Sequence, residues 1–287
     1  MRKRFKIEIR GKNYTLGERT WIMGILNVTP DSFSDGGLYF DQAKAVDRGL
    51  ELAAEGADII DVGGESTRPG SDFIPVEEEL KRVIPVISKL KEKTHAFISI
   101  DSNKSQVIKA ALDEGAEIVN DISSFRFDSK IVSIVAERNV PLVLMHMKGA
   151  PKTMQINPVY ENLLQEINSF LEERINKAVK NGVKREQIII DPGIGFGKTW
   201  RDNLRIINEL QFLEILDRPI LIGPSRKSFI GQVLEEPEDK RLEGTIVSSI
   251  IALERGAHIV RVHDVAEVKK AVVMAESILS FNSVNTP

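Results

Sequence analysis

The sequence predicts an α/β fold, a single (β/α)8 TIM barrel preceded by a short N-terminal β-hairpin. Three observations lead to this prediction. Eight short apolar segments recur along the chain, their apolar residues stand at consecutive positions, and stretches with helical periodicity separate them. Strands with consecutive apolar residues are typical of parallel sheets that are covered on both faces. Eight alternations of strand and helix, without a Pro/Gly/Ser-rich linker between them, favour one closed barrel.

The first element is a hairpin formed by residues 5–10 and 13–16 around Gly11 and Lys12, where glycine favours a tight turn. We expect residues 1–18 to form this hairpin and to close the bottom of the barrel, residues 19–282 to form the barrel, and residues 283–287 to form a tail. The predicted barrel strands are residues 21–27, 58–64, 96–102, 117–122, 141–147, 187–193, 219–225 and 258–264.

Helical periodicity and strong helix formers predict helices over residues 75–93, 104–114, 161–180 and 265–279. The segment 161–180 is the longest of these, and it could form a subunit interface or simply cover the barrel. A doubly wound open sheet would also alternate strands and helices, but it usually has fewer strands and a glycine fingerprint after the first. The closed barrel is therefore the better prediction.

The composition limits the possible function classes. The chain of 287 residues has 42% apolar and 28% charged residues, which is ordinary for a globular protein and excludes disorder as its main state. The 39 basic and 42 acidic residues give a formal charge of −3, which argues against nucleic acid or an anionic membrane as a partner. Cysteine is absent, so disulfides, thiolate metal sites and cysteine nucleophiles are excluded. Neither a secretory signal nor a membrane-spanning run is recognisable, and we expect a cytoplasmic protein.

Polar residues gather where the predicted strands end. In a barrel of this type, the C-terminal ends of the strands form the active-site face. Helix capping would explain an Asp or Ser at a single strand end, but it does not explain Arg261, Lys227 or His263. We therefore expect a site among the residues at these ends, which are Asn27, Asp61, Glu65, Asp101, Asn120, Asp121, His146, Asp191, Lys227, Arg261 and His263.

Two loops, residues 28–37 and 63–71, contain more glycine and charge than a barrel connection needs, and loops of this composition can close over a substrate. A third segment, GIGFGKT at residues 193–199, looks like a phosphate-binding loop, but Pro192 stands where the first glycine is required. The four histidines show no zinc-binding spacing. We therefore expect neither a nucleoside triphosphate site nor a zinc site.

Seven segments follow one another along the chain as MGILNVTPDSFSDGG, GADIIDVGGESTRPG, ISIDS, EIVNDIS, IIDPGIGFGK, GPSRKSFIG and RVHDV. Together they resemble the dihydropteroate synthase family, over about residues 21–273. The resemblance implies an enzyme of folate biosynthesis that condenses p-aminobenzoate with 6-hydroxymethyl-7,8-dihydropterin diphosphate and releases 7,8-dihydropteroate and diphosphate. It also implies Mg²⁺ as a cofactor, a homodimer and a target of sulfonamides.

The resemblance assigns the pterin to five residues. Asp191 would accept the two adjacent N–H donors of the pterin, because a carboxylate accepts such a pair bidentately. Asp101 and Asn120 would bind the remaining ring nitrogens and amino group, and Lys227 would donate to the carbonyl oxygen and a ring nitrogen. Thr67 would line the pterin and p-aminobenzoate sites.

The resemblance assigns the leaving diphosphate to Arg261 and His263, whose charge suits an anion. Asn27 would bind Mg²⁺ together with waters and phosphate oxygens. Loss of diphosphate leaves a cation on the exocyclic methylene carbon, so the enzyme needs no covalent nucleophile and acts by positioning and charge stabilisation. The residues expected to act in catalysis are Asp35, Arg68, Lys227, Arg261 and His263.

For p-aminobenzoate the resemblance implies a site on the two glycine-rich loops and on the segments after the sixth and seventh strands. Its expected residues are Phe33, Thr67, Pro69, Phe196 and Ser228.

Two other function classes remain as alternatives. A pterin-binding methyltransferase barrel would share Asp101, Asn120 and Asp191, but no diphosphate leaves in its reaction, so Lys227 and Arg261 with His263 would have no purpose. A non-catalytic pterin-binding module would keep the pocket without needing Asn27 and two polar loops. Turnover of both substrates separates these alternatives from a synthase.

Overall fold

The computed structural model describes residues 2–29, 38–66, 71 and 73–281. Its central sheet has eight parallel strands in the order β8-β7-β6-β5-β4-β3-β10-β9. A bridge between Ile190 and Ile220, with the Ile190 amide donating to the Pro219 carbonyl at 3.0 Å, joins the two end strands and closes the barrel. The strands are β3 (Trp21–Asn27), β4 (Ile59–Gly63), β5 (Phe97–Asp101), β6 (Ile118–Asp121), β7 (Leu142–Met145), β8 (Ile188–Asp191), β9 (Leu221–Ile222) and β10 (Ile259–Val262).

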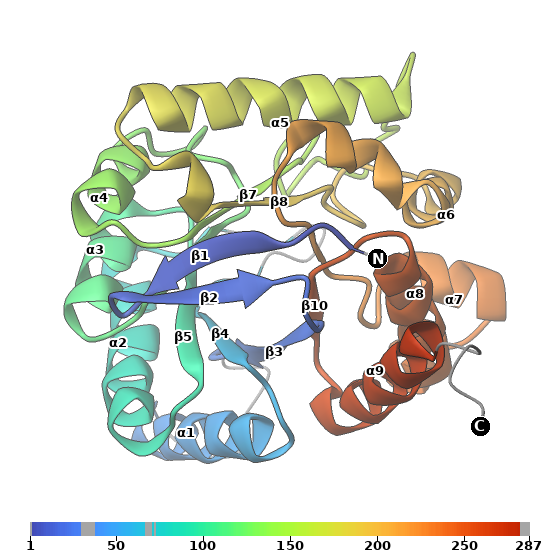
Figure 1. The fold of residues 1–287 in the computed structure, drawn as a ribbon. Coiled ribbons are helices and arrows are strands. Elements are labelled where there is room, and N and C mark those ends of the chain that lie inside the picture. The colour runs from blue at the N-terminus through green and yellow to red at the C-terminus, as the bar shows by residue number, and fades with distance from the viewer. Residues whose placement is uncertain (1, 30–37, 67–70, 72, 282–287) are drawn as a thin grey trace.

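Helices cover the outside of the barrel between successive strands (Figure 1). They are α1 (Leu38–Ala54), α2 (Val76–Lys93), α3 (Ser105–Asp113), α4 (Ile131–Arg138), α5 (Leu163–Lys180), α6 (Trp200–Asn208), α7 (Ser228–Leu234), α8 (Leu242–Glu254) and α9 (Val265–Ser280). Within the described ranges, three short 3-10 helices accompany them, η2 (Arg185–Gln187), η3 (Leu210–Leu216) and η4 (Glu238–Lys240). Among the described residues, no helix is both long and apolar enough to cross a membrane.

The predicted barrel is confirmed, and each of the eight predicted strands contains an observed one. The largest difference is β9, which has two residues where seven were predicted. Pro219 and Pro224 flank it, and proline has no N–H to donate to a strand ladder. Helix α5 begins at Leu163 instead of residue 161 because the Asn162 side chain caps it, accepting from the Gln165 amide.

The N-terminal hairpin is also confirmed. It consists of β1 (Phe5–Ile9) and β2 (Lys12–Leu16), which pair in antiparallel fashion. The two turn residues are Arg10 and Gly11, one position earlier than expected, and both have positive φ (55° and 68°), as the tight turn of a two-residue hairpin requires.

The hairpin closes the bottom of the barrel and lies across its opening in Figure 1. Ile7, Ile9 and Leu16 of the hairpin belong to one buried cluster with residues from the beginnings of all eight barrel strands. These strand residues are Trp21, Met23, Ile59, Phe97, Ile118, Val143, Ile189, Leu221 and Ile259. The lower half of the barrel is therefore a packed apolar core, and only its upper half can hold ligands.

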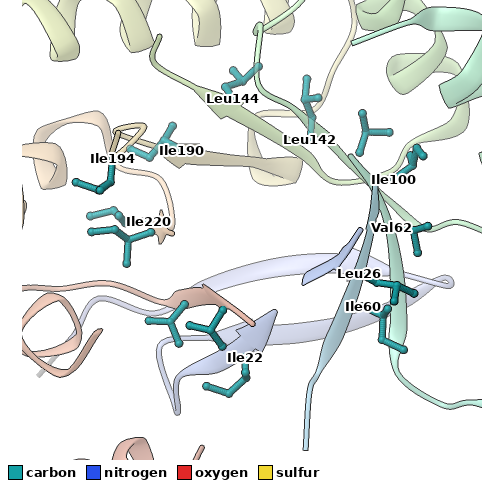
Figure 2. Packing of buried hydrophobic residues seen from close by; sticks show 14 of the residues in the cluster. Ile22, Leu26, Ile60, Val62, Ile100, Leu142, Leu144, Ile190, Ile194 and Ile220 are labelled. Atoms are coloured by element: carbon teal, nitrogen blue, oxygen red, sulfur yellow. The ribbon is translucent and has the colours of Figure 1, made fainter. Parts of the chain in front are cut away.

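A second and larger core lies between the strands and the surrounding helices. Figure 2 shows part of it, with Ile22, Ile60, Leu142 and Ile190 contributed by four different strands. Because the strands are buried on this face as well as inside the barrel, apolar residues occupy consecutive positions in their sequences.

Candidate active site

The inward-facing residues of the barrel strands change from apolar to polar between two neighbouring layers. Residues two positions apart on a strand face the same side. Above the apolar Ile59, Phe97, Ile118, Ile189 and Ile259 of the lower cluster therefore stand Asp61, Ser99, Asn120, Asp191 and Arg261. The sheet register places Asp61 beside Ser99, and Asp101 beside both Gly63 and Asn120. The upper layer is a polar floor at the C-terminal end of the barrel.

Arg261 is at the centre of this floor. Its Nε donates to Asp61 Oδ2 at 2.6 Å, and its Nη2 donates to Asp101 Oδ2 at 2.7 Å. Asn120 Nδ2 also donates to Asp61 Oδ2, at 2.9 Å. The guanidinium therefore joins β10 to β4 and β5, and two carboxylates determine its orientation.

The two carboxylates differ in their surroundings. Asp61 is completely buried, and its second oxygen, Oδ1, has no hydrogen-bond partner within the described residues. Burial raises the pKa of Asp101 to about 7, although the Arg261 guanidinium opposes this shift. Asp101 is therefore a carboxyl group that can gain or lose a proton near neutral pH, beside a cation whose charge is permanent.

Asp191 ends β8 on the other side of the barrel mouth. Its Oδ1 accepts a hydrogen bond from the Gly193 amide at 2.6 Å. Burial raises the pKa of Asp191 above its ordinary value, while the ammonium of Lys227 is the main charge opposing that shift. Asp191 thus presents a buried carboxylate to the barrel mouth, close to a compensating cation.

Lys227 precedes α7 and reaches back over the loop that follows β8. Its Nζ donates to the Ile194 carbonyl and lies 4.6 Å from the centre of the Phe196 ring. Burial lowers the pKa of Lys227 to about 8, with Asp191 acting in the opposite direction. The ammonium and the ring of Phe196 therefore form one wall beside Asp191.

His263 follows β10, and a serine orients it. The Oγ of Ser225 lies 2.9 Å from His263 Nδ1 and accepts from the His263 backbone amide at 3.2 Å. Next to this pair, Arg226 forms a bidentate ion pair with Asp264, in which Nε and Oδ2 are 3.0 Å apart. The ends of β9 and β10 are thereby tied together beside Arg261.

The described part of the chain brings most of the predicted site residues to one end of the barrel. These are Asn27, Asp101, Asn120, Asp191, Phe196, Lys227, Ser228, Arg261 and His263. Ser228, the first residue of α7, is exposed, whereas Phe196 and Asn27 are half-buried. Phe33, Asp35, Thr67, Arg68 and Pro69 lie outside the described residues.

Two polar residues from the strand ends face away from the site. Asp121 accepts from the amides of Ser123 and Phe125 at 2.8 and 2.5 Å, so it shapes a turn. His146 stands edge-on to Phe170 of α5, with ring centres 5.0 Å apart. Each of the two follows directly after an inward-facing residue, Asn120 or Met145. The two-residue period of a strand could therefore have shown from the sequence that Asp121 and His146 do not face the site.

Sequence reasoning assigned no role to Asp61 and did not consider Ser225. The two-residue period from Ile59 already places Asp61 inside the barrel, so a signal for Asp61 was present. Ser225 offered no comparable signal, because its function depends on His263, which is 38 residues away.

Lys198 of the segment 193–199 is held inside the protein. This lysine is 2% exposed, and its ammonium points to His146 and the Phe196 carbonyl, so it is not directed at a ligand site. Among the described residues, no group of three His, Cys, Asp or Glu side chains could hold a metal ion. A cation at this barrel mouth would need most of its oxygen ligands from substrate and water, with an amide such as Asn27 contributing one.

The comparisons with known proteins agree with this geometry. Residues 23–263 match the family model for pterin binding enzymes. The chain is 46% identical over 274 residues to the dihydropteroate synthase of Clostridium beijerinckii, covering 95% of this chain and 99% of that protein. It is 44% identical to the Escherichia coli dihydropteroate synthase, covering 90% and 92% of the two chains.

Solved structures show the same likeness. A dihydropteroate synthase of Yersinia pestis with a sulfonamide drug complex superposes with a TM-score of 0.91 at 39% identity, covering 96% of this chain and all of that one. The enzyme of Xanthomonas albilineans in complex with 7,8-dihydropteroate superposes with a TM-score of 0.88 at 40% identity, with the same coverage of 96% and 100%.

Proposed function

The chain belongs to the pterin binding enzyme family, within its dihydropteroate synthases, and from that premise we propose which residues carry each step of the reaction. The enzyme is a transferase of folate biosynthesis. It joins p-aminobenzoate to 6-hydroxymethyl-7,8-dihydropterin diphosphate and forms 7,8-dihydropteroate and diphosphate.

The pterin would lie flat on the polar floor of the barrel. Asp191 would accept its two adjacent N–H groups, because a buried carboxylate facing a pair of donors forms charge-assisted bonds. Asp101 and Asn120, on the neighbouring strands β5 and β6, would bind the remaining ring nitrogens and amino group. Lys227 would donate to the ring carbonyl from the wall above Asp191.

Arg261 and His263 would bind the departing diphosphate. A guanidinium has five N–H groups. The contacts with Asp61 and Asp101 engage Nε and Nη2, so other donors of Arg261 remain to face an anion. Ser225 would hold the His263 ring toward the same side. Since no covalent nucleophile is needed, these groups act by stabilising the charge of the leaving group.

We propose Mg²⁺ as the cofactor, with Asn27 as its protein ligand. The residues fit such an ion, because Asn27 ends β3 at the barrel mouth with an amide oxygen, the donor type that Mg²⁺ accepts beside waters and phosphates. When bound, Mg²⁺ would neutralise charge on the diphosphate. Asn27 would help to hold the leaving diphosphate at the barrel mouth, and the site would place the aniline nitrogen next to the methylene carbon.

The p-aminobenzoate site would be built on Phe196 and Ser228. The ring of Phe196 provides an apolar surface next to Lys227, and Ser228 presents an exposed hydroxyl at the start of α7. Phe33, Thr67 and Pro69 would complete this site, and Asp35 and Arg68 would act during the reaction.

We propose that the enzyme is a cytoplasmic homodimer. A chain without cysteine is compatible with a reducing compartment. Helices α8 and α9 expose Val247, Ile251, Met274 and Ile278, which are 37–61% exposed. Two-fold dimers are the commonest protein oligomers, and an apolar face of this kind suits a self-complementary contact.

The observation that carries the proposed mechanism is the polar floor, in which Arg261 and Lys227 flank the carboxylates of Asp101 and Asp191. The test supplies both substrates with Mg²⁺ and follows 7,8-dihydropteroate by mass spectrometry. Product formation that requires the diphosphate group supports the assignment of Arg261 and His263. Turnover that is unaffected in Arg261→Ala would move the diphosphate site elsewhere.

A further inference from the structure

Lys198 is a buried lysine to which the proposed reaction gives no role. Its Nζ lies 2.9 Å from His146 Nδ1, 3.0 Å from the Phe196 carbonyl oxygen and 3.3 Å from the His146 carbonyl oxygen. An ammonium has three N–H donors, and these three acceptors match them in number. The lysine therefore joins the chain after β7 to the loop after β8.

His146 can serve as one of these acceptors because it is neutral. Burial, followed by the charges of Lys198 and Arg126, lowers the pKa of His146 well below its ordinary value. A neutral imidazole has one acceptor nitrogen. The ring is also fixed from outside, since it packs edge-on against Phe170 at an interplanar angle of 87°. His146 is thus a rigid partner on the outer face of the barrel.

The glycine-rich loop of residues 193–197 depends on contacts with a rigid neighbouring segment for its shape. Gly193, Gly195 and Gly197 have φ of 70°, 81° and 67°, and glycine loses more conformational freedom on folding than other residues. A Cβ at Gly193 would lie 1.9 Å from the His146 carbonyl oxygen, so the loop backbone lies directly on the chain after β7. Lys198 bonds the same carbonyl.

The charge of Lys198 also acts on the site. Lys198 and Lys227 both favour the ionised form of Asp191, which burial disfavours. Burial lowers the pKa of Lys198 well below its ordinary value and Lys227 adds to this shift, whereas Asp191 and Asp202 oppose it. Asp191 and Lys198 thus favour each other's charged forms.

We propose that Lys198 is a positioning residue of the reaction, whose ammonium holds residues 193–197 in the shape that presents Asp191 to the pterin and Phe196 to p-aminobenzoate. The proposal rests on the proposed roles of those two residues. Lys198 makes two contributions that can be separated. Its hydrogen bonds to the His146 and Phe196 carbonyls shape the loop, whereas its charge favours the ionised form of Asp191.

Two variants distinguish these contributions. Lys198→Met removes the charge and every donor, whereas Lys198→Gln removes the charge but keeps two N–H groups for the carbonyls. We expect Lys198→Met to raise the KM for p-aminobenzoate at least about fivefold with a smaller change in kcat, since a displaced binding group acts mainly on binding. Both variants should lower the affinity for a pterin analogue in calorimetry, and Lys198→Gln should keep a KM for p-aminobenzoate near that of the wild type.

The matched control is Lys91→Met, whose lysine is partly buried on α2 and donates to Glu117, just before β6 at the lower end of the barrel. It should leave both affinities unchanged. Melting temperatures show which variants are folded, and if Lys198→Met does not fold, the pterin affinity of Lys198→Gln decides. The proposal is overturned if Lys198→Met is folded and has the KM for p-aminobenzoate and the pterin affinity of the wild type. If Lys198→Met does not fold, the proposal is overturned when Lys198→Gln has the pterin affinity of the wild type. Failure of the proposed function differs from this, because the wild type itself would then form no dihydropteroate.

Discussion

Asp61 and Asp101 share one guanidinium inside the barrel, whereas the main charge that compensates Asp191 is the ammonium of Lys227. These pairings give otherwise similar carboxylates different chemistry. Arg261 keeps its charge at every physiological pH, while the carboxyl group of Asp101 beside it has a pKa of about 7. Lys227 can lose its proton, so the Asp191 side depends on pH.

The exchange of a single carboxylate tests the pterin anchor. Asp191→Asn replaces one accepting oxygen by a donor that would face an N–H group of the pterin. Loss of a charge-assisted hydrogen bond lowers binding by about 1.5–3 kcal/mol, so we expect affinity for a pterin analogue to fall at least about tenfold. Titration calorimetry measures this, with the melting temperature as the control for folding. Unchanged affinity would remove Asp191 from the pterin site.

The lowered pKa of Lys227 predicts a pH dependence. Below about 8 the side chain is a cation that can bind the pterin carbonyl, and above that pH it becomes a neutral amine. Affinity for a pterin analogue should therefore decrease as the pH rises through about 8. The Lys227→Arg variant should bind the pterin analogue with an affinity that stays constant over the same pH range, because a guanidinium does not lose its proton there. The same decrease in Lys227→Arg would assign the titration to another group.

Among the elements, the loop between β8 and α6 shows how closely two connections can pack. The capping box of Thr199 and Asp202 starts α6 directly after this loop. Gln155 and Tyr160, from the connection after β7, donate to the Gly195 and Gly197 carbonyls at 2.6 Å each. The position of Phe196 thus depends on a neighbouring connection as well as on its own strand.

A pair of glycine substitutions tests this packing. Gly193→Ala places a methyl group 1.9 Å from a backbone oxygen, whereas Gly182→Ala meets only the Ala136 methyl at 3.5 Å. Both glycines have positive φ, so a backbone strain of about 1–2 kcal/mol is common to the two alanine variants. We expect Gly193→Ala to lower the free energy of unfolding by about 2–3 kcal/mol more and to raise the KM for p-aminobenzoate. Denaturant unfolding measures the difference. Equal losses of unfolding free energy in the two variants would show that the loop backbone can move to accommodate the methyl group at residue 193.

Among the described residues, α8 and α9 carry exposed apolar side chains on the outside of the barrel, while the lower opening of the barrel is closed by the hairpin. Figure 1 shows α8 and α9 next to each other on the outside of the barrel. This surface is a better candidate for a subunit contact than α5, because more of its large apolar side chains are exposed.

The proposed dimer predicts the effect of a charge on this surface. Ile278→Glu places a carboxylate on an α9 side chain that is 61% exposed, so the monomer fold should persist while association weakens by at least about tenfold. Ile215→Glu is the matched control, since Ile215 is 80% exposed on η3, which packs beside α5. Sedimentation of the variants over a concentration series measures association. If Ile215→Glu dissociates the dimer and Ile278→Glu does not, the contact lies on the α5 side.

The sequence by itself determined the strands, the closed barrel and the end of the barrel that carries the site. Strands such as Ile59–Gly63 can be recognised in the sequence because burial on both faces favours apolar residues at consecutive positions. The same alternation places Asp191 and Arg261 inside the barrel. Only the tertiary structure decided which charges meet. Arg261 and Asp61 are 200 residues apart, and the ammonium of Lys198 finds its acceptors on residues 52 and 2 positions away. Such pairings depend on distances between side chains from different strands, and these distances exist only after the sheet has closed.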